Sequence, residues 1–536
     1  MRSTSDPSRN RSIGRAPIFI AIPLALFAVG ARAQTISGPL HNEDETDFFW
    51  NARIEEGKAG EAIDRYVDVM ADAGVKVFLC NTNARKTNYR SAVWEAYWDG
   101  YDPEGPDDQP LFASTPKGEV AAFRKGIGNM LAVHRQGIDY PARVAARCRA
   151  RGMSPWISLR MNDCHYNDVP EHAFHGSFWK KNPQLRRKNC TGYFATCLDY
   201  ANAEVRDFYE ALVGESLDRW DIDGLELDFM REPYLFSAGK EAEGGPILTA
   251  WLRGVRRRTM EAAAMRGHPV RLGVRVPSRP ETASAMGLDA IGWAKEGLID
   301  LLVITPRWAT LEFDMPLERW RELLGDARVT LAGGLEVLCR PSPEATAAMV
   351  SPELAAGAAA SVLSRGADAV YLFNYFQSAN VGWTRPVYLR TLAAMASLDA
   401  LRPLPRSVAV TYRDIVAPGE SYRAPLPATG NELSFRMMAG PAGDARRPCE
   451  IRVGIAPRPG AAHPVPLVSA NGRPCTFLEE ATADGARRII WRVPSGSIGA
   501  DGICTLRIAS PDEDPLTVRS VELSIGAPLP GGGETR

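Results

Sequence analysis

From about residue 44 to residue 400, short apolar runs rich in β-branched residues alternate with longer stretches whose apolar residues recur at helical spacing. This alternation is typical of parallel strands joined by crossover helices. Eight such units in roughly 350 residues favour an α/β fold of the closed (β/α)₈ or TIM-barrel type. An open, doubly wound sheet is the alternative, but no GxGxxG motif follows an early strand. The eight expected strands are TDFFW (46–50), VKVFLCN (75–81), SPWISLRMN (154–162), DGLELDF (223–229), VRLGVRV (270–276), LIDLLVI (298–304), VTLAGGLE (329–336) and AVYLFNY (369–375).

After about residue 404 the pattern changes to short strand-like runs broken by Gly, Pro, Asn and Asp. Such a pattern indicates an antiparallel β-sandwich. We therefore expect a barrel domain over residues 34–403, a β-sandwich domain over residues 404–527 and a flexible tail over residues 528–536. The runs expected to form the sandwich are SVAVTY (407–412), ELSFRMM (432–438), EIRVGI (450–455), RIIWRV (488–493), CTLRIA (504–509) and VRSVELSI (518–525).

The first 33 residues have the order of a secretory signal peptide: four arginines, an apolar run over residues 16–30, then Ala31-Arg32-Ala33 before Gln34. The apolar run is shorter than the roughly twenty residues that a membrane-spanning helix needs. We therefore expect an exported protein, periplasmic or secreted, whose mature chain starts near Gln34 and has no membrane span.

The net charge and the cysteine spacing reduce the number of possible functions. Removal of residues 1–33 takes away five Arg and one Asp, so the formal charge changes from −1 to −5. A mildly acidic chain gives no support to nucleic-acid binding. The nine cysteines show no CxxC or Cys/His zinc spacing, so we expect neither a metal nor a cofactor. Some cysteines would pair in an oxidising compartment, and Cys190 and Cys197 are the best local candidates.

The strand expected over residues 223–229 carries two acidic residues on one face. Leu225, Leu227 and Phe229 alternate with Glu226 and Asp228, so both carboxylates would point into the barrel. Two inward carboxylates are costly without a function or a partner. Asp228 lies nearer the mouth and is the better candidate catalyst, whereas Glu226 is the better partner or structural acid. Salt bridges to barrel arginines are the alternative for both.

The strand expected over residues 329–336 ends in Glu336, with Gly333 and Gly334 expected to leave space beside it. The fourth and seventh strands lie across a barrel from each other. A carboxylate on each would flank a glycosidic bond, one as general acid and the other as nucleophile or base. A loop salt bridge is the alternative for Glu336.

The third strand is followed by several polar residues at the expected mouth. Asn and His side chains suit sugar hydroxyls, and Asp163 offers another catalytic acid or base. His165, His172 and His175 share one insertion, which permits a metal site with Asp163 or Asp168, although their spacing fits no helical ligand motif. The mouth residues of this strand are Arg160, Asn162, Asp163 and His165.

Four arginines, Arg160, Arg231, Arg275 and Arg307, stand at or just beyond four successive strand ends. Guanidinium groups around one opening favour a carboxylated, sulfated or phosphorylated substrate. Equally, they would neutralise the barrel carboxylates. Aromatic rings near the sixth and eighth strand ends are candidates for stacking on sugar faces, with core packing as the alternative. These aromatic residues are Trp308, Tyr371, Tyr375, Phe376 and Trp383.

Several segments in the same order resemble the glycosyl hydrolase-like family 10 barrels, mostly exported bacterial proteins. DGLELDFMREP (223–233) is similar to the family's "DGihfDyirYP", and WAKEGLIDLLVITPRW (293–308) to its "WvkeglIDyixPqxYw". Weaker similarities lie at residues 151–163, 198–209, 272–278 and 366–375. The resemblance implies a barrel that acts on a polysaccharide, with Asp228 at the family's strand-four acid. NDCH (162–165) and PRW (306–308) depart from the family pattern at the mouth, so no substrate can be carried over.

These observations favour an exported glycoside hydrolase acting on a polysaccharide or oligosaccharide, with an anionic glycan among the candidates. Asp228 would be the acid/base and Glu336 the opposite carboxylate. Two alternatives from other classes are a glycan-binding protein without catalysis and a metal-dependent carbohydrate esterase using Asp163 and His165. The oligomeric state is not predicted. The residues expected to shape the sugar site are Arg160, Asn162, His165, Glu226, Arg231, Arg275, Arg307, Trp308, Asn374 and Tyr375.

Overall fold

The computed structural model describes residues 36–377, 381–441, 447–457, 464–483, 485–512 and 514–526. The expected signal peptide and the expected tail over residues 528–536 lie outside this part. In the described part, no helix combines the length and the apolar character needed to cross a bilayer.

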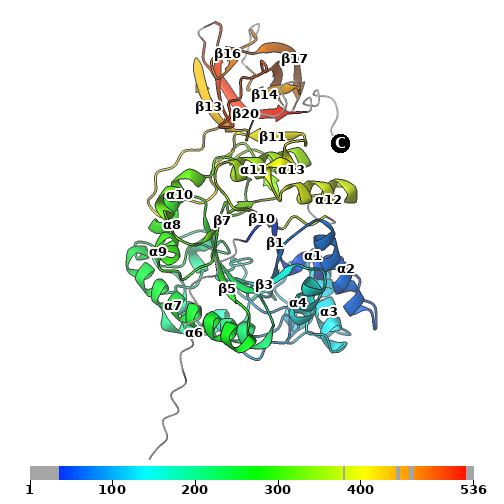
Figure 1. Cartoon of the computed structure of the whole chain (residues 1–536). Helices are drawn as coiled ribbons and strands as arrows, with labels where there is room; N and C mark the ends of the chain where they lie inside the picture. Colours follow the sequence, from blue (N-terminus) through cyan, green and yellow to red (C-terminus); the bar gives the residue numbers. More distant parts are fainter. Residues whose placement is uncertain are drawn as a thin grey trace, which may run out of the picture. The chain divides into compact units, whose positions relative to one another are not determined.

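Eight parallel strands close into a barrel, as predicted, and helices ring them (Figure 1). The sheet order is β1-β10-β7-β6-β5-β4-β3-β2, and each neighbouring pair is parallel. The open doubly wound sheet is thereby excluded. The barrel strands are β1 (Leu40–Glu43), β2 (Val77–Asn81), β3 (Ser154–Arg160), β4 (Gly224–Asp228), β5 (Arg271–Pro277), β6 (Leu301–Thr305), β7 (Thr330–Leu335) and β10 (Ala369–Phe373).

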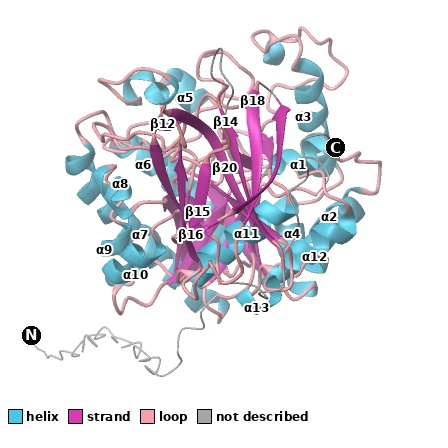
Figure 2. Ribbon diagram, turned by 90° about the horizontal axis from the view of Figure 1, so that it is seen from above, coloured by secondary structure: helices cyan, strands magenta, loops and turns pink. Residues whose placement is uncertain are grey.

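Thirteen α-helices connect or follow the described strands, and Figure 2 shows them around the outside of the strands. A short hairpin of β8 (Leu338–Cys339) and β9 (Ala348–Met349) follows β7. The helices are α1 (Glu45–Asn51), α2 (Ala59–Asp72), α3 (Val120–Arg135), α4 (Tyr140–Ala150), α5 (Ser177–Lys181), α6 (Ala203–Arg219), α7 (Glu241–Arg266), α8 (Pro280–Ala285), α9 (Ala290–Lys295), α10 (Leu317–Leu324), α11 (Pro352–Ser364), α12 (Arg385–Ala394) and α13 (Leu398–Leu401).

The expected first strand is wrong. TDFFW (46–50) lies in helix α1, and the first strand is Leu40–Glu43. Phe48 and Phe49 are both buried against Tyr140, with ring centroids 5.5 and 4.8 Å away. A run of five residues is too short for its periodicity to separate a strand from a helix, and packing decides here. The other seven expected barrel strands are confirmed.

The alternation of strand residues divides the barrel core into two parts. Leu225, Leu227 and Phe229 of the β4 region face the helices, as predicted from their parity. A separate cluster fills the barrel interior, and Ile36 lies in it with its amide donating to Thr330 Oγ1 at 3.2 Å. The interior cluster comprises Ile36, Leu40, Val77, Leu79, Trp156, Leu301, Val303, Ala332, Ala369, Tyr371 and Phe373.

Antiparallel sheets follow the barrel, as the strand-like runs predicted. One sheet has the order β11-β20-β14-β18-β17 with β12 also paired to β20, and the other has the order β13-β19-β15-β16. All six expected runs contain strands. Their bounds are β11 (Arg406–Ala409), β12 (Ala428–Gly430), β13 (Glu432–Met438), β14 (Cys449–Ile455), β15 (Leu467–Ala470), β16 (Arg473–Pro474), β17 (Thr476–Ala483), β18 (Ala486–Arg492), β19 (Ile503–Ala509) and β20 (Leu516–Ile525).

All nine cysteines lie in the described part and are free thiols, so the expected Cys190–Cys197 pair is not formed. A 3₁₀ turn (Tyr193–Thr196) separates the two residues and turns them to different neighbours. The Cys190 thiol donates to the Ala195 carbonyl at 3.9 Å, and the Cys197 thiol donates to the Asn162 carbonyl at 3.8 Å. Cys197 lies instead beside Cys164, whose pKa is raised by burial and by this neighbour.

Candidate active site

The C-terminal ends of the barrel strands surround a cleft of about 400 Å³, here called the mouth cleft. Its walls combine carboxylates, guanidinium groups, one imidazole and several aromatic rings. This composition is that of a pocket for a polar ligand with flat faces. The lining residues are Asp44, Asp47, Trp50, Asn51, Phe123, Arg160, His165, Tyr166, Phe174, Arg231, Trp308, Asn374 and Phe376.

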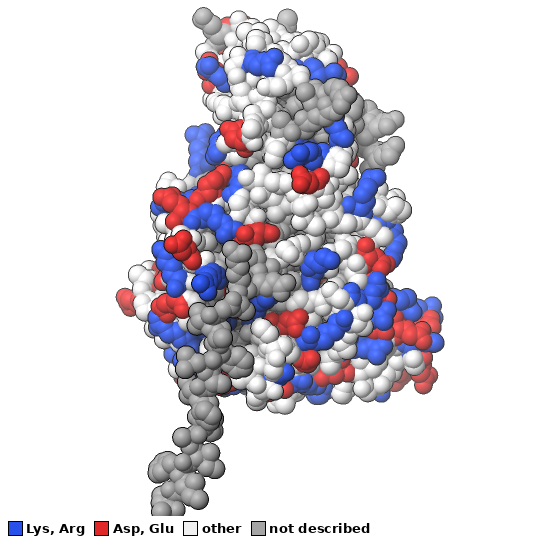
Figure 3. All heavy atoms as spheres, in the orientation of Figure 1, with Lys and Arg blue, Asp and Glu red and all other residues white. Residues whose placement is uncertain are grey.

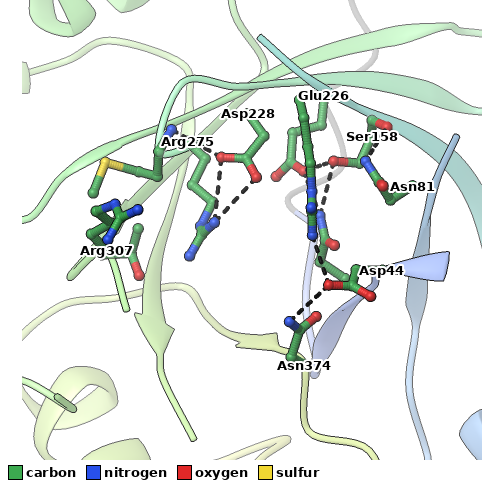
Figure 4. Close-up of polar contacts among 12 residues, drawn as sticks. Asp44, Asn81, Ser158, Glu226, Asp228, Arg275, Arg307 and Asn374 are labelled. Carbon is green, nitrogen blue, oxygen red and sulfur yellow. Dashed lines mark hydrogen bonds and ion pairs between the residues drawn. The ribbon is translucent and has the colours of Figure 1, made fainter. Parts of the chain in front are cut away.

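Two carboxylates line the mouth cleft that the sequence interpretation missed: Asp44, directly after β1, and Asp47, in α1. Asp44 Oδ2 accepts hydrogen bonds from Arg160 Nη2 at 2.7 Å and from Asn374 Nδ2 at 3.1 Å (Figure 4). Asp47 Oδ1 accepts a hydrogen bond from Asn51 Nδ2 at 3.0 Å. The polar run at residues 41–44 was the available signal, because polar residues at a strand end mark the barrel mouth. Misplacing the first strand concealed it.

A buried acid lies beside these two carboxylates. Burial and the nearby charges of Asp47 and Asp44 raise the pKa of Glu43 well above its usual value, although the Tyr66 hydroxyl donates a hydrogen bond to it. His41 Nδ1 is 3.1 Å from Glu43 Oε1, and burial lowers the pKa of His41 to about 4. Burial therefore favours the protonated form of Glu43 and the uncharged form of His41 at the end of β1.

Asp163 and His165 form a dyad at the end of β3. Asp163 Oδ1 is 2.8 Å from His165 Nδ1, and Arg160 Nη1 donates to Asp163 Oδ2 at 3.1 Å. Burial opposes ionisation of Asp163, but His165 and Arg160 hold its pKa well below the usual value. An ionised aspartate on Nδ1 orients an imidazole whose other nitrogen is free for proton transfer. The side chain of His165 is 40% exposed and lines the cleft.

The other histidines of this insertion are engaged in packing. His172 stacks on Tyr166 with centroids 3.9 Å apart, and His175 stacks on Trp179 at 4.1 Å. Burial lowers their pKa values to about 4 and about 3. In the described residues, no group of three or more His, Cys, Asp or Glu side chains is placed to hold a metal ion.

Glu226 points into the barrel, as predicted, and is fully buried. Its Oε2 accepts hydrogen bonds from Ser158 Oγ at 2.7 Å, Asn42 Nδ2 at 2.9 Å and the Tyr371 hydroxyl at 3.1 Å. Burial, and then the charge of Asp228, raise the pKa of Glu226. Glu226 thus joins β1, β3, β4 and β10 inside the barrel.

Asp228 and Glu336 share one arginine, as Figure 4 shows in part. Arg275 Nη1 lies 3.2 Å from Asp228 Oδ2, and Arg275 Nη2 lies 2.7 Å from Glu336 Oε1. All three side chains are buried. Burial raises the pKa of Glu336 to about 8, while Arg275 and Arg231 act to lower it. Glu336 Oε2 has no hydrogen-bond partner among the described residues.

The predicted catalytic pair lies below the floor of the mouth cleft. The Arg275 guanidinium lies over the Phe373 ring at 4.0 Å, and the Arg231 guanidinium lies over the same ring at 4.7 Å. Arg231 lines the cleft, whereas Asp228, Glu336 and Arg275 do not. One layer of side chains therefore separates the two predicted catalysts from the cleft.

The glycines of β7 do not leave space beside Glu336, contrary to expectation. A Cβ at Gly334 would meet Thr305 Oγ1 at 2.4 Å, and a Cβ at Gly333 would meet Val362 of α11 at 2.7 Å. Neighbouring side chains occupy the volume that each glycine vacates. The two glycines therefore permit close packing against β6 and α11.

The remaining predicted residues divide by position. Arg160, His165, Arg231, Trp308 and Asn374 line the mouth cleft, whereas the rest of the predicted sugar-site residues are not among its lining residues. Asn162 exchanges hydrogen bonds with the Leu198 backbone, both at 2.8 Å. Arg307 pairs with Glu232, with Nη2 2.7 Å from Oε1. The Tyr375 hydroxyl donates to the Glu336 carbonyl at 3.1 Å.

A residue beyond the expected barrel domain holds the loop after β6. The Asp414 carboxylate accepts hydrogen bonds from the backbone amides of Arg307, Trp308 and Ala309, at 2.9, 2.7 and 2.6 Å. Three consecutive amides on one carboxylate fix the loop that carries Trp308 into the cleft.

The surface gives no sign of a uniformly charged partner on the face shown in Figure 3, where basic and acidic side chains are interspersed. Among the ion pairs of the described residues, Arg143–Asp64, Arg147–Asp68 and Arg151–Asp72 connect α4 or its C-cap to α2. The charged groups of interest are therefore those inside the mouth.

Comparison with known proteins gave no match among protein-family models and none among curated proteins. The resemblance to the glycosyl hydrolase-like family 10 barrels therefore stays a prediction.

Among solved structures, this chain has matches of low similarity. The PgaB (BpsB) glycoside hydrolase domain from Bordetella bronchiseptica is 10% identical, with 66% of this chain and 99% of that chain covered and a TM-score of 0.39. The noncanonic maltogenic α-amylase AmyB from Thermotoga neapolitana is 9% identical, covers 92% and 99%, and has a TM-score of 0.35. The α-L-fucosidase isoenzyme 1 from Paenibacillus thiaminolyticus is 12% identical, covers 88% and 96%, and has a TM-score of 0.33. These values carry no argument about function, and the barrel assignment rests on the strand pairing itself.

Proposed function

We propose that this protein hydrolyses O-glycosidic bonds of a polysaccharide that binds in the mouth cleft. The observation that carries the proposal is the composition of that cleft: Asp44 and Asp47 lie in one space with the rings of Trp50, Trp308 and Tyr166. Aromatic rings suit the apolar faces of sugars, and glycoside hydrolysis needs carboxyl groups at the scissile bond. The predicted export would place this activity outside the cytoplasm.

We assign the acid/base chemistry to Asp44 and Asp47, because these are the carboxyl groups that line the cleft. Asp44 is ion-paired with Arg160 at 2.7 Å, which favours its ionised form and suits a nucleophile or base. Asp47 and Asp44 both act to raise the pKa of the buried acid Glu43, so three carboxyl groups crowd this side of the cleft. Crowded carboxyl groups tend to divide into a protonated and an ionised member, as the reaction requires.

The pair predicted from the sequence, Asp228 and Glu336, is the alternative assignment. Its support is that Glu336, with a pKa of about 8, is protonated at neutral pH and would serve as an acid. Against it stands the burial of both side chains around Arg275. For this pair to act, the Arg231 layer would have to move aside when a glycan binds.

The test is release of new reducing ends from a panel of neutral and anionic polysaccharides by the mature chain. Asp44→Asn and Asp47→Asn should each slow turnover about a hundredfold or more. Asp326→Asn, an exposed acid on the surface, is the matched control and should keep full activity. If Asp228→Asn and Glu336→Gln abolish turnover at unchanged melting temperature while Asp44→Asn and Asp47→Asn do not, the predicted pair is the catalytic one.

A second function, glycan recognition without turnover, is favoured by one observation. The three inward carboxylates Glu226, Asp228 and Glu336 are all buried and hydrogen-bonded within the barrel, as in a structural network. Glycan binding by the native chain, with no reducing ends from any polysaccharide in the panel, would establish this function instead of hydrolysis.

A further inference from the structure

The four arginines expected at the mouth do not share one role. Arg160 is bound to Asp44 and Asp163, at 2.7 and 3.1 Å. Arg275 is bound to Asp228 and Glu336, at 3.2 and 2.7 Å. Arg307 is bound to both carboxylate oxygens of Glu232. Three of the four guanidinium charges are therefore compensated by carboxylates of the chain itself.

Arg231 is the exception. It is 3% exposed and lines the mouth cleft, yet its guanidinium forms no ion pair or hydrogen bond with any described residue. Its contacts are with aromatic rings: the guanidinium carbon lies 4.7 Å from the Phe373 centroid and 5.6 Å from the Trp308 centroid. The side chain is thus held in place by two rings while its hydrogen-bond donors remain unused.

A buried, unpaired guanidinium is unfavourable without an anion. Burial and the neighbouring charge of Arg160 both lower the pKa of Arg231, although Glu232 and Glu336 partly offset them. Glu336, with its own pKa raised to about 8, is protonated at neutral pH and carries no compensating charge there. An anionic group entering the cleft would regain the hydrogen bonds and the charge balance that the chain does not supply.

We infer that Arg231 is the binding site for the carboxylate of an acidic sugar residue in the polysaccharide substrate. The inference rests on the proposed function, whose substrate class it specifies. A carboxylate matches the planar guanidinium and can bind it through two parallel hydrogen bonds. Trp308, 39% exposed beside Arg231, offers a face for the ring of the same sugar. Asp44 and Asp47 line the same cleft, so one available cation there suits a group with a single negative charge.

The experiment compares binding of polyuronates, namely polygalacturonate, alginate and hyaluronate, with their carboxyl-reduced forms by titration calorimetry on the mature chain. Dextran sulfate and dextran form a second matched pair. The native chain should bind at least one polyuronate at least tenfold more tightly than its reduced form. Arg231→Met should remove that preference and leave binding of the reduced form unchanged. Arg257→Met, which removes an exposed charge on α7, should change neither.

Arg231→Lys keeps the charge but not the planar pair of donors, so it should fold and show an intermediate preference. Three results would overturn the inference: no preference of the native chain for any polyuronate over its reduced form, an undiminished preference in both Arg231 variants, or tighter binding of dextran sulfate than of every polyuronate. Reducing ends are assayed in the same samples. If neither Arg231 variant affects hydrolysis, the proposed function stands and the inference about Arg231 is wrong. If binding depends on Arg231 but no hydrolysis occurs, the inference stands and the proposed function is wrong.

Discussion

One carboxylate oxygen of Glu336 accepts a hydrogen bond from Arg275, and the other has no hydrogen-bond partner in the part of the chain that the structure describes. Burial therefore dominates its ionisation and raises its pKa to about 8 from an ordinary value of 4.5. Between those two values the folded protein keeps a proton on this group that the unfolded chain has already lost. The protein's stability must consequently fall as the pH rises across this range.

We predict that the urea midpoint of unfolding declines between about pH 7 and pH 8. Each such group contributes up to about 1.4 kcal/mol of lost stability per pH unit, and the raised pKa of Glu226 acts in the same direction. The buried histidines are neutral in the folded protein throughout this window. Their protonation in the unfolded chain, with an ordinary pKa of 6.5, opposes the decline, and this contribution fades as the pH rises. Glu336→Gln should reduce the slope, and an unchanged slope in that variant would show that Glu336 is ionised in the native protein.

At the same scale, the sequence predicted which residues face the barrel interior but not which of them reach the ligand. Parity places Glu226, Asp228 and Glu336 on inward faces, and the structure agrees. The alternation of side chains along a strand does not show which residues cover these carboxylates. Arg275, Arg231 and Phe373 are brought over them by the pairing of other strands. Asp44 and Asp47 were missed for a different reason, since their strand was assigned to the residues of α1.

At the scale of elements, helix α11 packs tightly on the barrel through glycine. A Cβ at Gly333 of β7 would lie 2.7 Å from Val362 of α11, and a Cβ at Gly357 of α11 would lie 1.9 Å from the Ser407 carbonyl of β11. Helix α11 is thus in close contact with β7 on one side and with β11 on the other. The sequence showed glycines in β7, but only the helix position reveals that they serve packing.

Gly333→Ala should therefore destabilise the protein by about 1–3 kcal/mol, because the added methyl group pushes α11 away from β7. Gly254→Ala is the matched control: it lies within α7, and its nearest neighbour to an added Cβ is Arg257 Nη2 at 3.7 Å. That substitution should stabilise by about 0.5–1 kcal/mol. Chemical denaturation measures both, and equal effects of the two changes would contradict the packing argument.

Element types were well predicted where the pattern was long, as in seven of the eight barrel strands and the six sandwich runs. The predicted sandwich runs did not include β12, β15 and β16, which have four residues or fewer, nor β17, which has eight. TDFFW is helical because its aromatic residues pack on Tyr140. Tertiary contacts overrule local pattern in such short segments.

At the scale of the whole molecule, the start of the described chain closes the barrel interior. Ile36 is buried with Trp156 and Leu301, and its amide donates to Thr330. The predicted cleavage near Gln34 would leave this residue in place. We expect a chain starting at Gln34 to have the melting temperature of the full chain, whereas Ile36→Ala in that chain should cost about 2–4 kcal/mol. N-terminal sequencing of the exported protein tests the cleavage site itself.

Asp414 connects a segment outside the expected barrel domain to the loop after β6. Asp414→Ala would leave three amides without their acceptor, and we expect a loss of about 1–3 kcal/mol. Hydrogen exchange at residues 307–309 should accelerate, and glycan binding should weaken as Trp308 loses its position. Asp399→Ala, an exposed acid of α13, is the control. Unchanged exchange at residues 307–309 would show that the loop is held by other contacts.

The position of Asp414 bears on how this protein can evolve. Trp308 lines the mouth cleft, and its backbone amide is bound by the carboxylate of Asp414, more than one hundred residues later in the chain. A barrel combined with a different C-terminal region would lose these hydrogen bonds to the loop after β6, even if every residue that lines the cleft were conserved. Substitutions around residue 414 can therefore shift ligand preference without touching the ligand. We expect homologues to vary the two segments together, so that the C-terminal region carries part of the substrate specificity.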